Sequence, residues 1–181
     1  INKEQLTEKL KELAKQNKNK KRSLEQLLEL TKRYYIAKKQ EKLKEELEQL
    51  AKDQEDLSEE SKDDNTKEKQ DELNDRFKDF QKELEELQKE NQKLWSPLEV
   101  AQDKKNESEI KEEQQNASDN LEKKEQSQNQ ENQESDLNNA KKNQKKAAQK
   151  MKQMSQMMAQ AVGSCAGGGD KLSEDIDVLR Q

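Results

Sequence analysis

Apolar residues recur in this chain at alternating steps of three and four, in four separate blocks. That spacing places each block on one face of an α-helix, where it can be buried only against another helix. The blocks are Leu6, Leu10, Leu13, Leu24, Leu27 and Tyr34; then Leu43, Leu47, Leu50 and Leu57 in a shifted frame; then Leu73, Phe77, Phe80, Leu84, Leu87 and Leu94; and finally Leu137, Ala140, Ala147, Met151, Met154, Met158 and Ala161. The pattern predicts an all-α fold of long antiparallel helical hairpins with coiled-coil seams.

The chain is too polar to close a thick core. Charged residues make up 43% of it and hydrophobic residues only 27%, whereas ordinary domains are roughly half apolar. Burial of apolar area must outweigh the entropy of ordering the chain. We therefore expect a partly extended molecule with little globular core.

Polar and turn-forming residues divide the first 97 residues into three predicted helices. The apolar-free stretch 17–22 separates a helix at about 2–17 from one at about 23–61, and Ser23 with Gln26 matches a capping box. A turn at 63–66 follows, with Thr66 as the N-cap of a helix at about 66–95. Pro97 ends that helix, because a residue before proline avoids helical geometry.

The rest of the chain is predicted to hold one long polar helix at 98–162, since no glycine or proline interrupts it before Gly163. Its low-complexity part, 103–136, is so rich in Glu, Gln, Asn and Lys that fraying or disorder is the alternative. A flexible glycine-rich joint is expected at 163–169, and a further helix is expected to begin in 170–181.

Four polar residues fall at seam positions of the apolar blocks. Such residues fix the register of paired helices at some cost in stability. We expect the substitution Asn91→Leu to raise the melting temperature and loosen pairing. The four residues are Asn17, Gln54, Asn91 and Gln144.

The chain lacks the usual parts of an active site. It has no histidine, and carboxylates on narrow, solvated helices gain little of the burial that shifts a pKa toward neutrality. Asp53 and its acidic neighbours lack the glycine of a calcium loop. The acidic middle, with 32 acidic and 16 basic residues over 41–136, is unlike a nucleic-acid interface. We predict no enzyme, no cofactor, no metal and no nucleic-acid partner.

Aromatic and methionine residues form the candidate interaction surface. Adjacent aromatics in an aliphatic chain mark a partner contact or the end of an intrachain seam. The methionines are adaptable packing residues, and soft thioether ligation of Cu(I) is the less favoured alternative. The candidates are Tyr34, Tyr35, Trp95, Met151, Met154, Met157 and Met158.

Several segments resemble a family of large, membrane-anchored proteins of unknown function typical of the Bacteroidota. They are 23–35, which ends in Leu-Thr-Lys-Arg-Tyr-Tyr, together with 50–57, 144–158 and 174–181. The resemblance implies the central coiled-coil region of such a protein, with an anchor upstream of Ile1, helices continuing beyond Gln181, and a location on the periplasmic side of the cell envelope. No stretch of this segment approaches the ~18 apolar residues of a membrane span, so we expect no direct membrane insertion by it.

The favoured function is a structural scaffold or spacer that binds protein partners, or further copies of itself, through heptad seams. A periplasmic chaperone or holdase with helical arms is one alternative. A disordered segment that folds on its partner is the other.

Overall fold

The computed structural model describes the chain from residue 3 to residue 166, and its side chains from residue 5 to residue 161. Within that range the chain forms four helices: α1 (Lys3–Glu59), α2 (Lys67–Asn91), α3 (Lys104–Gln126) and α4 (Gln130–Ala166). The described part contains helices, turns and loops but no strand, which confirms the predicted all-α class. Coiled-coil seam geometry stays a prediction.

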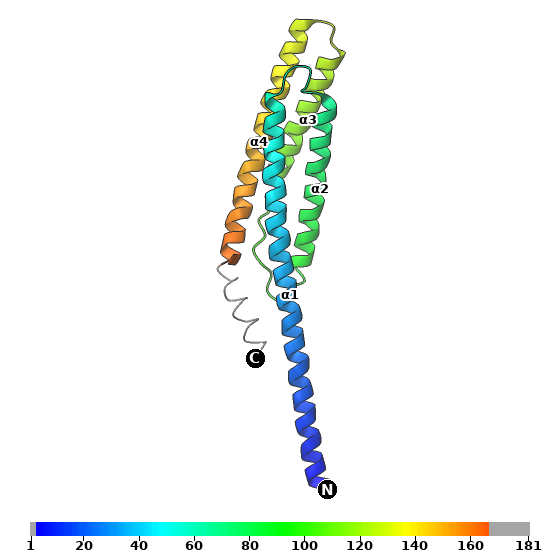
Figure 1. The fold of residues 1–181 in the computed structure, drawn as a ribbon, viewed down its shortest axis with the longest axis vertical. Helices are drawn as coiled ribbons and strands as arrows, with labels where there is room; N and C mark the ends of the chain where they lie inside the picture. The colour runs from blue at the N-terminus through cyan, green and yellow to red at the C-terminus, as the bar shows by residue number, and fades with distance from the viewer. Residues whose placement is uncertain (1–2, 167–181) are drawn as a thin grey trace.

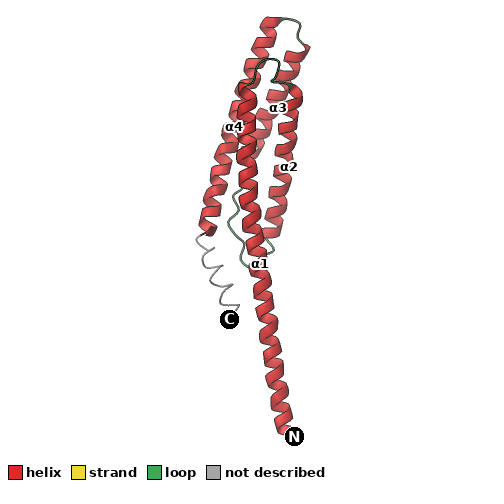
Figure 2. Cartoon of the chain, in the orientation of Figure 1, coloured by secondary structure: helices red, strands yellow, loops and turns green. Residues whose placement is uncertain are grey.

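The four helices form an elongated bundle in which each helix lies between two neighbours. α1 packs against α2 and α4, and α3 packs against the same two helices. α1 and α3 run in one direction and α2 and α4 in the other, so consecutive helices are antiparallel (Figures 1 and 2). The first part of α1 projects beyond the bundle as a single helix (Figure 1).

α1 is continuous, so the predicted break at 17–22 is wrong. The stretch holds no glycine or proline, and its Lys, Arg and Asn side chains are exposed, where a helix tolerates them. Ser23 does not cap a new helix, because its hydroxyl donates back to the carbonyl oxygen of Asn19 (3.0 Å). Such back-bonding is typical of serine inside a helix.

The turn between α1 and α2 lies where it was predicted. The Thr66 hydroxyl accepts a hydrogen bond from the backbone N–H of Lys69 (3.4 Å) as the N-cap of α2. Asn65 is fully buried below the turn, and its Nδ2 donates to the carbonyl oxygen of Leu57 (2.8 Å). From α3, Nζ of Lys124 donates to the carbonyl oxygens of Lys62 and Asn65, both at 2.7 Å. These bonds pair one carbonyl group in the last turn of α1 and two in the turn that follows it.

α2 ends at Asn91, a few residues before the predicted boundary, and a loop of residues 92–103 follows. Asn91 fixes this loop from both sides. Its Nδ2 donates to the carbonyl oxygen of Leu98 and its Oδ1 accepts from the backbone N–H of Leu98, each at 2.8 Å. Leu98, Val100 and Ala101 pack against the core, so the loop covers the part of the bundle that α3 does not reach.

The predicted single helix at 98–162 is wrong, because a turn at 127–129 divides it into α3 and α4. Ser127 and Asn129 form local bonds there: the backbone N–H of Asn129 donates to Ser127 Oγ (3.3 Å), and that of Glu131 donates to Asn129 Oδ1 (2.9 Å). Both residue types favour turns for this reason. The turn also lets Leu121 pack with Leu137 and Ala140, which a straight helix would leave in water.

The tract 103–136 is therefore helical apart from that turn, and the alternative of disorder is not what the structure shows. Residues 163–166 of the predicted glycine-rich joint belong to α4. The rest of the joint and the predicted helix in 170–181 lie outside the described residues.

The core contains leucines, two phenylalanines and methionines from all four helices. Phe77 and Phe80 stack with ring centroids 5.9 Å apart. Ion pairs join α4 to its neighbours around this core. Lys152 contacts Glu55 of α1 (2.6 Å), and Lys146 contacts Glu113 of α3 (3.2 Å).

A layer of four glutamines crosses the core, one from each helix. Gln54 and Gln70 exchange hydrogen bonds of 2.8 and 3.0 Å. Nε2 of Gln114 donates to Gln54 Oε1 (3.1 Å), and Nε2 of Gln144 donates to Gln70 Oε1 (3.0 Å). Asn65 extends the network by exchanging two 2.9 Å bonds with Gln144. Each of the predicted seam residues Gln54 and Gln144 is therefore hydrogen-bonded to a residue of another helix.

Candidate interaction surface

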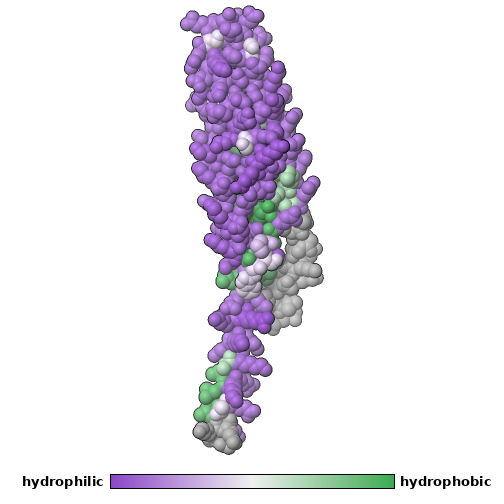
Figure 3. Space-filling view, turned by 180° about the vertical axis from the view of Figure 1, so that it is seen from behind, coloured by the Kyte–Doolittle hydropathy of each residue, from purple (hydrophilic) through white to green (hydrophobic). Residues whose placement is uncertain are grey.

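The projecting part of α1, residues 5–28, carries six of the ten large hydrophobic side chains that are exposed in the described chain, and we call it the arm. Every side chain from residue 5 to residue 28 is exposed. Six leucines in this range keep between 43% and 67% of their surface in solvent. They are Leu6, Leu10, Leu13, Leu24, Leu27 and Leu28. Figure 3 shows an apolar patch near the end of the projecting helix and further apolar surface toward its junction with the bundle, with hydrophilic surface between them. The upper part of the bundle is mostly hydrophilic in this view.

The arm leucines are not a continuation of the bundle seam. Inside the bundle, α1 buries Ile36, Leu43, Leu50 and Leu57 in one heptad row, with Gln40, Leu47 and Gln54 in the other. The arm stripe, which we define as Leu6, Leu10, Leu13, Asn17, Lys20, Leu24, Leu27, Thr31 and Tyr34, follows a different heptad frame. Counted in that repeat, the two faces are about 150° apart around the helix. The arm stripe therefore points away from the side of α1 that packs against α2 and α4. Longer α2 and α4 helices would not cover it.

An uncovered helix of this kind is poorly stabilised. At about 1.5 Å per residue the arm is about 36 Å long. A helix in a protein gains most of its stability by packing its apolar face against other elements. Fully burying one leucine is worth roughly 1.5–3 kcal/mol. Because the five leucines of the stripe are already about half covered by their own helix, a second helix over the stripe would add on the order of 5 kcal/mol before ordering costs.

Tyr34, Tyr35 and Trp95 lie near the point where the arm meets the bundle, and their role as an aromatic seam end or partner contact stays a prediction. All three are more than half exposed. The loop after α2 is held against α1 at this point: the backbone N–H of Trp95 donates to Glu29 Oε1 (2.7 Å), and Nη1 of Arg33 donates to the carbonyl oxygen of Ser96 (2.5 Å). We call this region the base of the arm.

A small cavity opens at the base, beside the aromatic residues. Its volume is about 230 Å³. Tyr35 and Ile36 of α1 and Leu94 of the loop supply its apolar wall. Lys32, Glu90 and Lys93 supply its polar wall. Leu24, Leu28 and Tyr35 share one side of α1, so the apolar surface of the arm continues to the mouth of this cavity.

The methionines do not belong to this surface. Met151, Met154 and Met158 are almost completely buried in the same core as Leu43, Leu47 and the phenylalanines. Only Met157 is exposed, at 40%. The prediction of a methionine interaction face is therefore corrected: three of the four fill the bundle core because they continue the seam of α4, where a flexible side chain fits irregular gaps.

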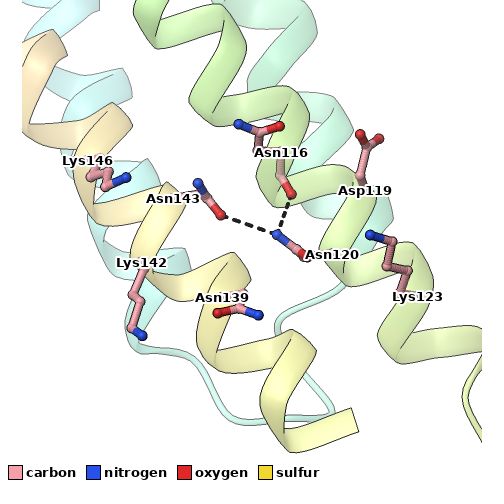
Figure 4. A pocket seen from close by; sticks show the side chains of 8 residues that line it. All are labelled: Asn116, Asp119, Asn120, Lys123, Asn139, Lys142, Asn143 and Lys146. Atoms are coloured by element: carbon pink, nitrogen blue, oxygen red, sulfur yellow. Dashed lines mark hydrogen bonds between the residues drawn. The ribbon is translucent and has the colours of Figure 1, made fainter. Parts of the chain in front are cut away.

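A second hollow lies between α3 and α4 (Figure 4). It is an open groove of about 420 Å³, lined by Asn116, Asp119, Asn120 and Lys123 of α3 and by Asn139, Lys142, Asn143 and Lys146 of α4. Nδ2 of Asn120 donates to the carbonyl oxygen of Asn116 (2.8 Å) and to Oδ1 of Asn143 (3.2 Å). Nδ2 of Asn143 donates to Oε2 of Glu113 (2.6 Å). These bonds join α3 to α4, which makes the groove a polar helix–helix contact.

Two buried ionisable groups depart from their ordinary behaviour. Burial raises the pKa of the Glu107 carboxyl, against the opposing hydrogen bond from Gln81 Nε2 (3.2 Å). Burial lowers the pKa of the Lys124 ammonium. Other charged groups lie near each of them: Glu85 and Asp103 near Glu107, and Asp63 and Glu125 near Lys124. Among residues 3–166, no three acidic, histidine or cysteine side chains are grouped to hold a metal ion.

The sequence showed the arm leucines but not their exposure. Leu6, Leu10 and Leu13 form a seam as regular as the others, and regularity alone does not say whether a partner is in the same chain. The signal that could have found the arm is the change of heptad frame between Tyr34 and Leu43, because one straight helix cannot pack both frames against one bundle.

None of the described helices combines the length and apolar character needed to cross a bilayer. The chain matches no family model, no curated protein and no solved structure in these comparisons.

Proposed function

We propose that this chain is a helical scaffold that holds a partner helix on its arm. The observation that carries the proposal is the exposure of six leucines on one part of α1, while the remaining seams of the described chain are buried in the bundle. The bundle supplies a rigid support: its helices are joined by the glutamine layer and by ion pairs, and the base fixes the direction in which the arm leaves. An envelope location in a membrane-anchored parent stays a prediction from the family resemblance.

One structural observation favours a scaffold over a chaperone. A holdase needs an adaptable apolar surface for many clients, and the methionines that would supply it are buried. The arm instead offers one narrow stripe at helical spacing, which fits the apolar face of another helix.

Site-specific photocrosslinking along the arm of the full-length parent, in cells, tests the proposal. A crosslinking residue placed at Leu10, Leu13 or Leu24 lies on the stripe, whereas one at Glu8, Lys15 or Arg22 lies on the opposite face of the same helix. We expect adducts of a few defined proteins at the stripe positions only. Adducts with a broad, variable set of proteins would favour the chaperone. Equal adducts at the stripe positions and at the positions on the opposite face would contradict docking on the stripe.

A further inference from the structure

The edges of the arm stripe carry positive charge and no negative charge. Residues beside a heptad seam face the partner helix and set which partner is accepted. In the frame of the arm stripe, the flanking positions from residue 5 to residue 28 are Thr7, Lys9, Ala14, Gln16, Lys21, Ser23 and Leu28. Lys20 lies within the stripe itself. The carboxylates of the arm, Glu8, Glu12 and Glu25, fall at outer positions of the heptad.

These lysines are open to a partner. Lys9, Lys20 and Lys21 are exposed. Lys21 contacts Glu25 at 4.0 Å, a long contact with both side chains more than half in solvent, and such pairs hold their members weakly. A carboxylate approaching from the stripe side can therefore pair with Lys21 without displacing a strong bond.

A second copy of the arm fits this surface poorly. In a parallel pair, the flanking positions on one side of the seam face those on the other side, and in an antiparallel pair like faces like. Neither arrangement gives any of the three lysines a carboxylate to face, because the arm has none at these positions. Like charges across a seam disfavour pairing.

We propose that the occupant of the arm is an acidic amphipathic helix of another protein, with aliphatic residues at its own seam and Asp or Glu beside it. This inference rests on the proposed function, because it names the partner class for the same stripe. The base adds two cations near the end of the arm: its cavity, beside Tyr35, is lined by Lys32 and Lys93 with the single carboxylate of Glu90. A carboxylate side chain at the end of the docked helix meets two cations there.

The test uses the full chain and three labelled peptides of about four heptads each, the length of the arm. All three carry Leu at seam positions, and their flanking positions carry Glu, Gln or Lys. Fluorescence anisotropy at low ionic strength, where exposed charge pairs are least screened, measures each affinity. We expect the Glu peptide to bind about tenfold tighter than the Lys peptide, as three exposed charge pairs would give, with the Gln peptide between them.

Two matched triple variants show where the charge acts. Lys9→Glu with Lys20→Glu and Lys21→Glu changes three stripe-side lysines, and should reverse the order of the Glu and Lys peptides. Lys11→Glu with Lys15→Glu and Lys18→Glu makes the same change in net charge on the outer faces, and should keep the original order. Circular dichroism of both variants checks that each remains helical.

The outcomes separate this inference from the proposed function. Equal binding of all three peptides would overturn the choice of an acidic partner and leave the arm as a docking site for helices. Failure of every peptide to bind would count against both. A dimer in sedimentation that Leu10→Asp dissociates would identify a second copy as the occupant. Glu-peptide binding that appears only after removal of residues 167–181 would identify the chain's own C-terminal segment. Either result would overturn the inference.

Discussion

The four glutamines of the buried layer are paired across helices, and a single substitution among them should cost more than its share of a combined one. Gln70 bonds with Gln54, Gln144 and Asn74. Removing it alone leaves buried amide groups of its partners unsatisfied, each at roughly 1–3 kcal/mol. We expect Gln70→Leu to lower the free energy of unfolding by about 2 kcal/mol. Replacing all four glutamines by leucine should recover part of that loss, because only the buried Asn65 then remains without its glutamine partner. Urea melts measure both, and a quadruple variant as unstable as the sum of the single ones would contradict the network.

Glu107 should make the bundle less stable as pH rises. Burial raises the pKa of this carboxyl in the folded chain, so the folded state holds its proton more tightly than the unfolded state does. Stability is then highest below the ordinary glutamate pKa and falls as pH rises through the folded value. Glu107→Gln keeps a group that accepts from Gln81 and removes the charge. We expect it to stabilise the chain by about 1 kcal/mol at pH 7 and to have no effect well below pH 4. Thermal melts at the two pH values test this, with the exposed Glu112→Gln as control.

Asn91 shows how the structure changes an expectation formed from the sequence. Because polar seam residues fix register at some cost in stability, the sequence predicted that Asn91→Leu would raise the melting temperature. In the fold, both polar atoms of its side chain bond Leu98, which fixes the loop that covers the lower bundle. The substitution should instead lower the melting temperature, since it leaves the backbone groups of Leu98 without those partners. A rise would support the original view that the residue acts only on register.

At the scale of the helix, α1 is one element with two different environments. The same substitution should therefore have different effects along it. Leu43→Ala opens a cavity in the bundle core and should lower the free energy of unfolding by about 2–5 kcal/mol. Leu24→Ala on the arm should change it by less than about 0.5 kcal/mol, as surface substitutions do. Equal losses in denaturant melts would mean that the arm is buried in the isolated chain.

The helical segments were largely predictable, but most of the boundaries between them were not. The seam of α2 from Leu73 to Leu87 and the cap at Thr66 follow from local sequence rules that hold in the fold. The turn at 127–129 was missed because Ser127 and Asn129 are as compatible with a polar helix as with a turn, and only the packing of Leu121 against Leu137 decides between them. The same limit applies to the methionines. Their spacing defines a face, but burial of that face depends on which helices surround it.

At the scale of the whole molecule, the described chain consists of a packed bundle and a projecting arm. The candidate site follows from this division and not from any single residue. Tyr34, Tyr35 and Trp95 were predicted as interaction residues. The structure leaves all three side chains exposed, and their role in binding stays a prediction. The arm leucines belong to the candidate site because the face of α1 that is buried in the bundle lies on another side of the helix than the arm stripe.

Amide hydrogen exchange of the full chain, read by mass spectrometry, tests this division most directly. Protection reports local opening, and segments with few buried contacts exchange fastest. We predict that amides of residues 5–28 exchange at least about a hundredfold faster than those of residues 36–57 in the same helix, on the scale of local against global opening. Equal protection of the two segments would show that the arm stripe is already covered in the isolated chain, and would contradict a free docking surface.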